Sequence, residues 1–160
     1  GPRRVPIASF FLAYRKTALK RGEFVSAIEF ELPRPSESLR LEKVSQRKDL
    51  DISAVNAAFR IDWKNRKRRT TAEVRIALGG VAATPVRMKQ TEAILSESEL
   101  TSARIEAALE ELQRELHPIS DLRGSAAFRR VATENLLRRF LEEFGVSSDQ
   151  GQPLLDLEGK

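Results

Sequence analysis

The feature that most constrains the fold is a pair of strand-like runs joined by a short and highly charged connection. Residues 51–61 form an apolar run typical of a β-strand, and residues 70–78 alternate apolar and polar side chains, as a half-buried strand does. Between them lies DWKNRKRR, residues 62–69, which predicts a hairpin loop. Gly79 and Gly80 then interrupt the β-pattern, which is typical of a bulge or of close backbone approach. The sequence therefore predicts an antiparallel hairpin near the middle of the chain.

The second half of the chain has the pattern of helices. A short helix is expected over 88–95, a stronger one over 101–116 with Thr101 or Ser102 as its cap, and the longest over 125–144. The longest helix carries a wide apolar stripe made of Phe128, Val131, Ala132, Leu136, Leu137, Phe140, Leu141 and Phe144. Strands followed by helices favour the α+β class, here a small antiparallel β-sheet packed against about three helices.

Three weaker apolar patterns complete the expected organisation. Residues 24–32 alternate partly and stop at Pro33, which predicts a strand, and residues 81–86 predict another short one. Residues 7–14 form an apolar patch that is too short for an independent helix. We therefore expect this patch to pack against another surface.

Composition bounds the kind of protein. A chain of 160 residues with 41% hydrophobic and 32% charged residues is typical of one soluble globular domain, and no run of about 18 apolar residues predicts a membrane span. The absence of cysteine excludes disulfides, iron–sulfur ligation and thiolate zinc sites within the chain, and His117 alone cannot form a multi-histidine metal site. These features are compatible with a reducing compartment, and we expect a cytoplasmic protein.

The net charge of +5 raises the question of nucleic-acid binding. The basic run at 64–69 has only Trp63 as an aromatic neighbour and matches no named binding motif, and 23 acidic residues are interspersed among the 28 basic ones. A solvated turn is the favoured interpretation of the run, so we expect no nucleic-acid partner. A steep salt dependence of DNA binding would support the opposite interpretation.

Candidate catalytic groups are few. There is no GxSxG elbow for a serine nucleophile and no glycine-rich phosphate loop. The carboxylate pairs Asp49/Asp51 and Glu142/Glu143 are explained more simply by ion pairing or turn capping. We expect neither a catalytic nor a metal-ligating residue in this chain.

Lys43 is the most informative single residue. It follows Leu39 and Leu41 at alternate positions, so it lies on the otherwise apolar side of a strand. A lysine there either packs its stem and extends its amine to water or contacts a partner. From spacing alone, the first alternative is favoured.

Five segments, in order along the chain, resemble one family. They are FFLAYRKT (10–17), GEFVSAIE (22–29), KVSQRKDLDISAV (43–55), ALGGVAATP (77–85) and DLRGSAAFR (121–129). They are similar to the C-terminal part of the FAD-binding module of xanthine dehydrogenases, a domain shared with carbon monoxide dehydrogenase flavoproteins. Phe128 stands where this family usually has tyrosine. The resemblance covers nearly the whole chain and agrees best with bacterial two-subunit xanthine dehydrogenases.

The resemblance implies an electron-transfer role. In such enzymes a molybdenum centre with molybdopterin hydroxylates a purine, electrons cross two [2Fe-2S] clusters to FAD, and the flavin reduces NAD. The implied partners are upstream FAD-binding and iron–sulfur segments, a molybdenum-binding subunit and NAD. Alternatives are the flavoprotein part of a carbon monoxide, nicotinate or aldehyde enzyme, or a non-catalytic scaffold that docks through helix 125–144.

The resemblance also implies site residues. Val25 corresponds to an apolar FAD contact, and Lys43 corresponds to a lysine that contacts the flavin. The loop from Arg47 to Asp51 corresponds to one beside the isoalloxazine, with Lys48 as a possible contact on the NAD side. A cation near the flavin stabilises the negative charge of its reduced form, and basic residues steer dinucleotide phosphates.

The expected domain organisation follows from the same comparison. Residues 1–22 form a leader that would join an upstream FAD-binding half, residues 23–145 form the α+β domain, and residues 146–160 form a mobile tail. Because the phosphate-binding half lies outside this sequence, we expect the chain alone neither to hold FAD tightly nor to oxidise xanthine. Phe10, Phe11 and Tyr14 would pack on the upstream half, so we expect an exposed apolar patch.

Overall fold

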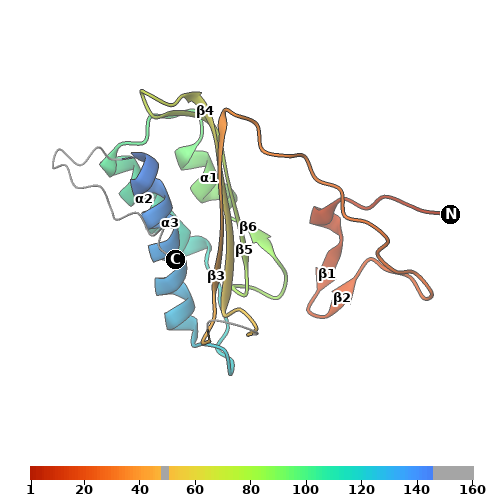
Figure 1. The fold of residues 1–160 in the computed structure, drawn as a ribbon. Coiled ribbons are helices and arrows are strands. Elements are labelled where there is room, and N and C mark those ends of the chain that lie inside the picture. The colour runs from red at the N-terminus through yellow and green to blue at the C-terminus, as the bar shows by residue number, and fades with distance from the viewer. Residues whose placement is uncertain (48–50, 146–160) are drawn as a thin grey trace, which may run out of the picture.

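The computed structural model describes residues 1–47 and 51–145 and has an α+β architecture. Its main sheet is antiparallel with strand order β3-β4-β5-β6, and three helices cover one face of it (Figure 1). The strands are β3 (Glu37–Val44), β4 (Val55–Asn65), β5 (Thr70–Gly79) and β6 (Val86–Arg87), and the helices are α1 (Lys89–Leu95), α2 (Ser102–Glu115) and α3 (Ala126–Gly145). The fold class expected from the sequence is confirmed.

The core lies between the helices and the central strands. Alternate side chains of β4 and β5 are buried, because successive residues of a strand point to opposite faces. Phe59 of β4 stacks on Phe140 of α3 with ring centroids 5.2 Å apart. Burying an aliphatic or aromatic side chain of this size contributes roughly 1.5–3 kcal/mol. This alternation leaves the opposite residues of the same strands facing away from the helices.

The predicted hairpin forms, but its loop is shorter than expected. Strand β4 continues to Asn65, so the turn comprises only residues 66–69. Trp63, which was expected in the loop, is 7% exposed and donates a 2.9 Å hydrogen bond from Nε1 to Ser38 Oγ. Burial of this indole extends the strand. The charged residues around Trp63 predicted a loop, because they gave no sign that this one large side chain has a core position.

All three helices are present near their expected bounds. Thr101 caps α2, because its hydroxyl accepts the backbone N–H of Arg104 at 3.3 Å. The expected apolar stripe of α3 is wrong at Phe128 and Val131, which are 46% and 59% exposed. At about 100° per residue, nine positions make about two and a half turns, so Phe128 lies on the side of the helix opposite the buried Leu137.

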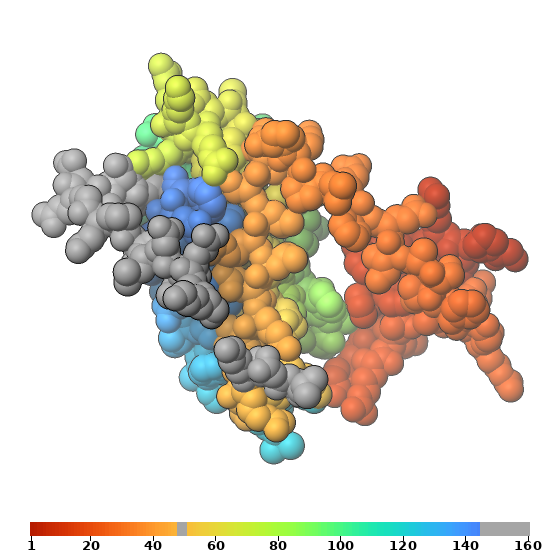
Figure 2. Space-filling view, viewed as in Figure 1, coloured from red at the N-terminus to blue at the C-terminus, as the bar shows by residue number. Residues whose placement is uncertain are grey.

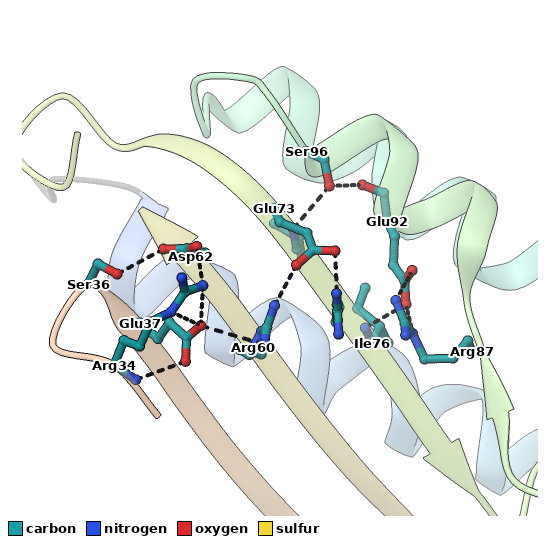
Figure 3. Close-up of polar contacts among 12 residues, drawn as sticks. Arg34, Ser36, Glu37, Arg60, Asp62, Glu73, Ile76, Arg87, Glu92 and Ser96 are labelled. Atoms are coloured by element: carbon teal, nitrogen blue, oxygen red, sulfur yellow. Dashed lines mark hydrogen bonds and ion pairs between the residues drawn. The ribbon is translucent and has the colours of Figure 1, made fainter. Parts of the chain in front are cut away.

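The outer edge of β5 is completed by α1 and the turn that follows it (Figure 3). Strand β6 has two residues instead of the six expected at 81–86. Beyond it, the Glu92 carboxylate accepts the N–H of Ile76 at 2.7 Å, and Ser96 Oγ accepts the N–H of Val74 at 3.0 Å. These side chains act in place of a neighbouring strand and leave fewer backbone groups open to edge pairing.

Residues 1–32 form an N-terminal arm on the side of the sheet opposite the helices, and the space-filling view shows it protruding from the body (Figures 1 and 2). It contains a 3-10 turn η1 (Ile7–Ser9) and a small hairpin of β1 (Phe11–Ala13) and β2 (Lys16–Thr17). Among the secondary-structure elements, these three contact only one another.

The strand predicted over 24–32 is wrong, since these residues have no regular structure. A strand needs a hydrogen-bonded neighbour, and the described part of the chain offers none here. The large apolar side chains of the arm are correspondingly exposed. Those with more than half of their surface exposed are Ile7, Leu12, Tyr14, Phe24, Ile28, Phe30 and Leu32.

Candidate functional site

The face of the sheet that points away from the helices carries a shallow hollow of about 500 Å³. Two rows of paired residues cross the strands there. One row joins Leu41, Ala58 and Ala77, and the other joins Lys43, Asn56 and Gly79. The side chains on the two central strands are small, so the floor of the hollow is low. Larger side chains that line it include Leu41 and Lys43 of β3 and Pro85, which precedes β6.

Lys43 is exposed and makes no ion pair or side-chain hydrogen bond with any residue in 1–47 or 51–145. Its ammonium therefore has no counter-ion in this part of the chain. An unpaired cation beside a low apolar floor suits a flat ligand that carries negative charge or acceptor atoms. The structure thus places Lys43 at the edge of this hollow.

The charges at the other end of the same face are paired (Figure 3). Glu37 lies 2.9 Å from the guanidinium of Arg34 and 3.5 Å from that of Arg60. Arg60 also pairs with Glu73, which lies 2.8 Å from Arg75. Hydrogen bonds from Arg34, first from its backbone N–H, hold the pKa of Glu37 below its ordinary value. Arg34 also lies 2.8 Å from Asp62, so three arginines and three carboxylates neutralise this end of the face, whereas Lys43 leaves the other end positive.

Asp51 anchors the connection between β3 and β4. Its carboxylate accepts the backbone N–H of Arg47 at 2.9 Å and that of Ile52 at 2.8 Å. The first of these hydrogen bonds is the main cause that lowers the pKa of Asp51 from its ordinary value. These two hydrogen bonds are turn-capping contacts of the kind predicted for Asp51, and the carboxylate stays ionised near neutral pH. The side chain of Arg47 is 78% exposed and lies 3.9 Å from Asp51.

Of the other predicted site residues, Val25 is not brought to the hollow. Val25 lies in the arm, where it is 50% exposed, and it is not among the residues that line the hollow. Lys48, like Asp49 and the tail 146–160, lies outside the described residues.

Sequence reasoning missed the floor of the hollow and one buried cation. The floor residues Asn56 and Ala58 could have been found, because they occupy the positions of β4 that alternate with its large apolar residues. The cation is Arg129, which is 4% exposed. Its guanidinium donates to the carbonyl of Gly80 and lies 2.5 Å from Asp121 Oδ1.

The remaining surface offers little chemistry. His117 is exposed beside a second hollow of about 310 Å³ that Arg87 and Glu115 also line. No group of three or more His, Cys, Asp or Glu side chains suited to a metal ion occurs in the described ranges. Within those ranges, none of the helices has the length and apolar character needed to cross a membrane.

Comparisons with known proteins identify the family of this domain. A family model described as the CO dehydrogenase flavoprotein C-terminal domain matches residues 40–144. The nicotinate hydroxylase of Emericella nidulans is 34% identical over 140 residues, and the xanthine dehydrogenase of the same organism is 31% identical over 144. These matches cover 85% and 87% of this chain but only 10% of each relative.

A shorter relative and solved structures give the same result. The xanthine dehydrogenase FAD-binding subunit of Escherichia coli O157:H7 is 29% identical, with 89% of this chain and 48% of the subunit covered. A chain of the carbon monoxide dehydrogenase of Hydrogenophaga pseudoflava matches with a TM-score of 0.71 and 26% identity, covering 86% of this chain and 46% of the other. A chain of the quinoline 2-oxidoreductase of Pseudomonas putida 86 has a similar fold, with a TM-score of 0.68. It is 23% identical, and the match covers 85% of this chain and 46% of the other.

These matches define the class: a flavoprotein part of the molybdenum hydroxylases. The chain belongs to the family of CO dehydrogenase flavoprotein C-terminal domains. It spans about a tenth of the long relatives and about half of the E. coli subunit.

Proposed function

We propose that this chain forms the part of an FAD site that faces the flavin ring. The observation that carries the proposal is Lys43, a cation without a partner in the described chain, at the edge of a hollow floored by Ala58, Ala77 and Gly79. The fit is chemical: small side chains let a planar ring approach the sheet, and the ammonium offers a donor and a positive charge to its polar edge.

Each residue has a distinct part in this proposal. FAD, when bound, supplies the two-electron chemistry that connects iron–sulfur clusters with NAD. Lys43 binds the flavin and stabilises negative charge on its reduced form, and the low floor excludes water from one side of the ring. Arg47 and Lys48 steer the phosphates of NAD. Asp51 holds Arg47 through its backbone N–H, and Val25 contacts FAD from the arm.

The other part of the site lies in a partner segment. The chain spans about half of the E. coli FAD-binding subunit. Its arm lies on the side of the sheet opposite the helices (Figure 1), and the apolar side chains of the arm are exposed. We propose that an upstream FAD-binding segment binds the arm and holds the FAD phosphates. Iron–sulfur segments with [2Fe-2S] clusters and a molybdenum subunit with molybdopterin complete a cytoplasmic enzyme.

The parent enzyme is proposed to be a xanthine dehydrogenase that transfers electrons from purines to NAD. Support comes from relatives with that name, among them the E. coli subunit. The nicotinate hydroxylase of Emericella nidulans supports the second candidate, a nicotinate-oxidising enzyme. NAD reduction by the purified complex with xanthine, hypoxanthine and nicotinate separates the two.

The test of the flavin site is Lys43→Met in the complete enzyme. Losing a hydrogen bond to a charged group costs about 1.5 kcal/mol, so FAD should dissociate about tenfold more readily and NADH formation should fall. Lys67→Met is the matched control, because Lys67 is an exposed lysine in the 66–69 turn at the far end of β4. Unchanged flavin content and NADH formation in Lys43→Met would contradict the proposal.

A further inference from the structure

Arg129 is a buried cation whose burial needs an explanation. It lies in the first turn of α3, is 4% exposed, and has a single carboxylate partner, Asp121. Its Nε has no hydrogen-bond partner among the described residues. Burying a guanidinium with incomplete pairing is costly, and a well-packed apolar residue is often as stabilising. Stability alone therefore does not account for an arginine here.

One nitrogen of the guanidinium contacts the chain just after the end of β5. Nη1 donates to the carbonyl of Gly80, which has a φ of +81°. A Cβ on Gly80 would collide with the carbonyl oxygen of Ala54, so these two backbones are in close contact. Ala54 in turn donates its N–H to the carbonyl of Val44 at 2.7 Å. The contacts from Arg129 thus reach Val44, which follows Lys43.

The other terminal nitrogen of the guanidinium contacts the turn before α3. Asp121 Oδ1, which lies 2.5 Å from Arg129 Nη2, also accepts the N–H of Arg123 at 2.8 Å. Gln46, which follows β3, donates from Nε2 to the carbonyl of Leu122 at 3.3 Å. The guanidinium therefore joins the end of β5 to a turn that also holds the chain leaving β3.

These contacts converge at one end of the hollow. The row Lys43–Asn56–Gly79 closes the hollow at the ends of β3 and β5 and the start of β4. Each of these three segments is linked to Arg129 through Gly80, Ala54 or Asp121. Because Arg129 is not among the residues that line the hollow, its action on a ligand there is indirect.

We propose that Arg129 is a positioning residue for the flavin: it sets the separation between Lys43 and the floor at Asn56 and Gly79. This inference rests on the proposed flavin site and adds a residue that acts from the helix side of the sheet. An arginine suits the task because its rigid fork binds two acceptors in fixed directions. A lysine keeps the charge but cannot hold both Gly80 and Asp121 in the same geometry.

The test compares Arg129→Lys with Arg130→Lys in the complete enzyme. Arg130 is the matched control, because it donates to the carbonyls of Gln113 at 2.6 Å and Leu116 at 2.5 Å, away from the hollow. Both variants should lower the melting temperature. Only Arg129→Lys should raise the FAD dissociation constant, about tenfold, and shift the visible absorption bands of the bound flavin.

The inference is overturned if Arg129→Lys binds FAD with the wild-type constant and spectrum, or if Arg130→Lys changes both as much. Should Arg129→Lys not fold, Asp121→Asn takes its place, because it weakens the same link and keeps the Gly80 contact. A wild-type constant for that variant overturns the inference equally. Lys43→Met distinguishes the proposed flavin site from the proposed role of Arg129. If Lys43→Met weakens FAD binding and Arg129→Lys does not, Arg129 does not position the flavin, and the proposal of the flavin site is retained.

Discussion

Gly79 and Gly80 are adjacent, but their surroundings differ. Gly80 has a φ of +81°, and a Cβ there would collide with the carbonyl of Ala54. A side chain at this position is strained by both backbone and contact, so Gly80→Ala should lower the free energy of unfolding by about 2–3 kcal/mol. Urea denaturation followed by tryptophan fluorescence measures this, since Trp63 is buried in the same sheet.

Gly79→Ala is the control for that substitution. A Cβ at Gly79 would lie 3.5 Å from Asn56 Cβ, which is an ordinary contact distance, and its backbone has no positive φ. The free energy of unfolding should change by less than about 0.5 kcal/mol. Equal losses for the two variants would show that close packing of the strand end, and not the conformation of Gly80, limits stability.

Asp121 gives a pH-dependent prediction. Its carboxylate accepts the N–H of Arg123 and pairs with Arg129, and these contacts, the first most strongly, lower its pKa from the ordinary value of an aspartate. A carboxylate with a lowered folded-state pKa stabilises the fold above its unfolded pKa, and the contribution is lost as the pH falls through the folded value.

Wild type should therefore resist urea better than Asp121→Asn at pH 7, and the difference between their midpoints should shrink below about pH 4. Unfolding curves at several pH values measure the difference. A constant difference down to about pH 2 would indicate that the side chain contributes through its shape and not its charge.

The sequence predicted part of the candidate site at this scale. The alternation of Leu39, Leu41 and Lys43 is a local pattern that predicts one shared side of a strand, and the structure places these three residues together on the face that points away from the helices. The burial of Arg129 depends on Asp121 and on Gly80, which is 49 positions away. Local patterns do not carry such a contact, so the burial of this arginine cannot be recognised from the sequence alone.

Among the elements, the edge of β5 depends on α1. Glu92 is 7% exposed, accepts the N–H of Ile76, and lies 2.5 Å from Arg87 Nε. Glu92→Ala would leave a buried N–H without an acceptor and Arg87 without its partner. The free energy of unfolding should fall by about 2–3 kcal/mol, and the Ile76 amide should exchange its hydrogen faster.

An exposed carboxylate provides the control for Glu92. Glu110 lies 4.0 Å from Arg114 on the surface of α2 and is 73% exposed. Glu110→Ala should change the free energy of unfolding by less than about 0.5 kcal/mol. Unchanged protection of the Ile76 amide in Glu92→Ala would show that water replaces the carboxylate at the strand edge.

The elements also show where sequence patterns stop being informative. The runs that became β4 and β5 were recognised because each buries one face against helices of the same chain. The run 24–32 has a similar alternation but no neighbouring strand among the described residues, and it has no regular structure. Alternation predicts a strand only where a partner strand is available.

In the whole molecule, the regular elements and ion pairs of the arm are separate from those of the body. The arm's ion pairs, Arg3 with Glu23 and Arg4 with Glu29, lie within it, and its elements contact only one another. Arg34, just after the arm, pairs with Glu37 and Asp62 of the sheet. A chain shortened to begin at Arg34 should therefore keep the free energy of unfolding of the full chain.

The same shortening should remove the exposed apolar surface of the arm. Binding of the dye ANS should fall, because the side chains that expose it, such as Phe24, Ile28 and Phe30, are gone. The shortened chain should also lose affinity for the separately produced upstream segment, which calorimetry or co-purification measures, while its unfolding curve stays unchanged. A loss of more than about 1 kcal/mol in the free energy of unfolding would mean that the arm stabilises the body. In that case, weaker binding of the upstream segment would reflect the fold and not the lost surface.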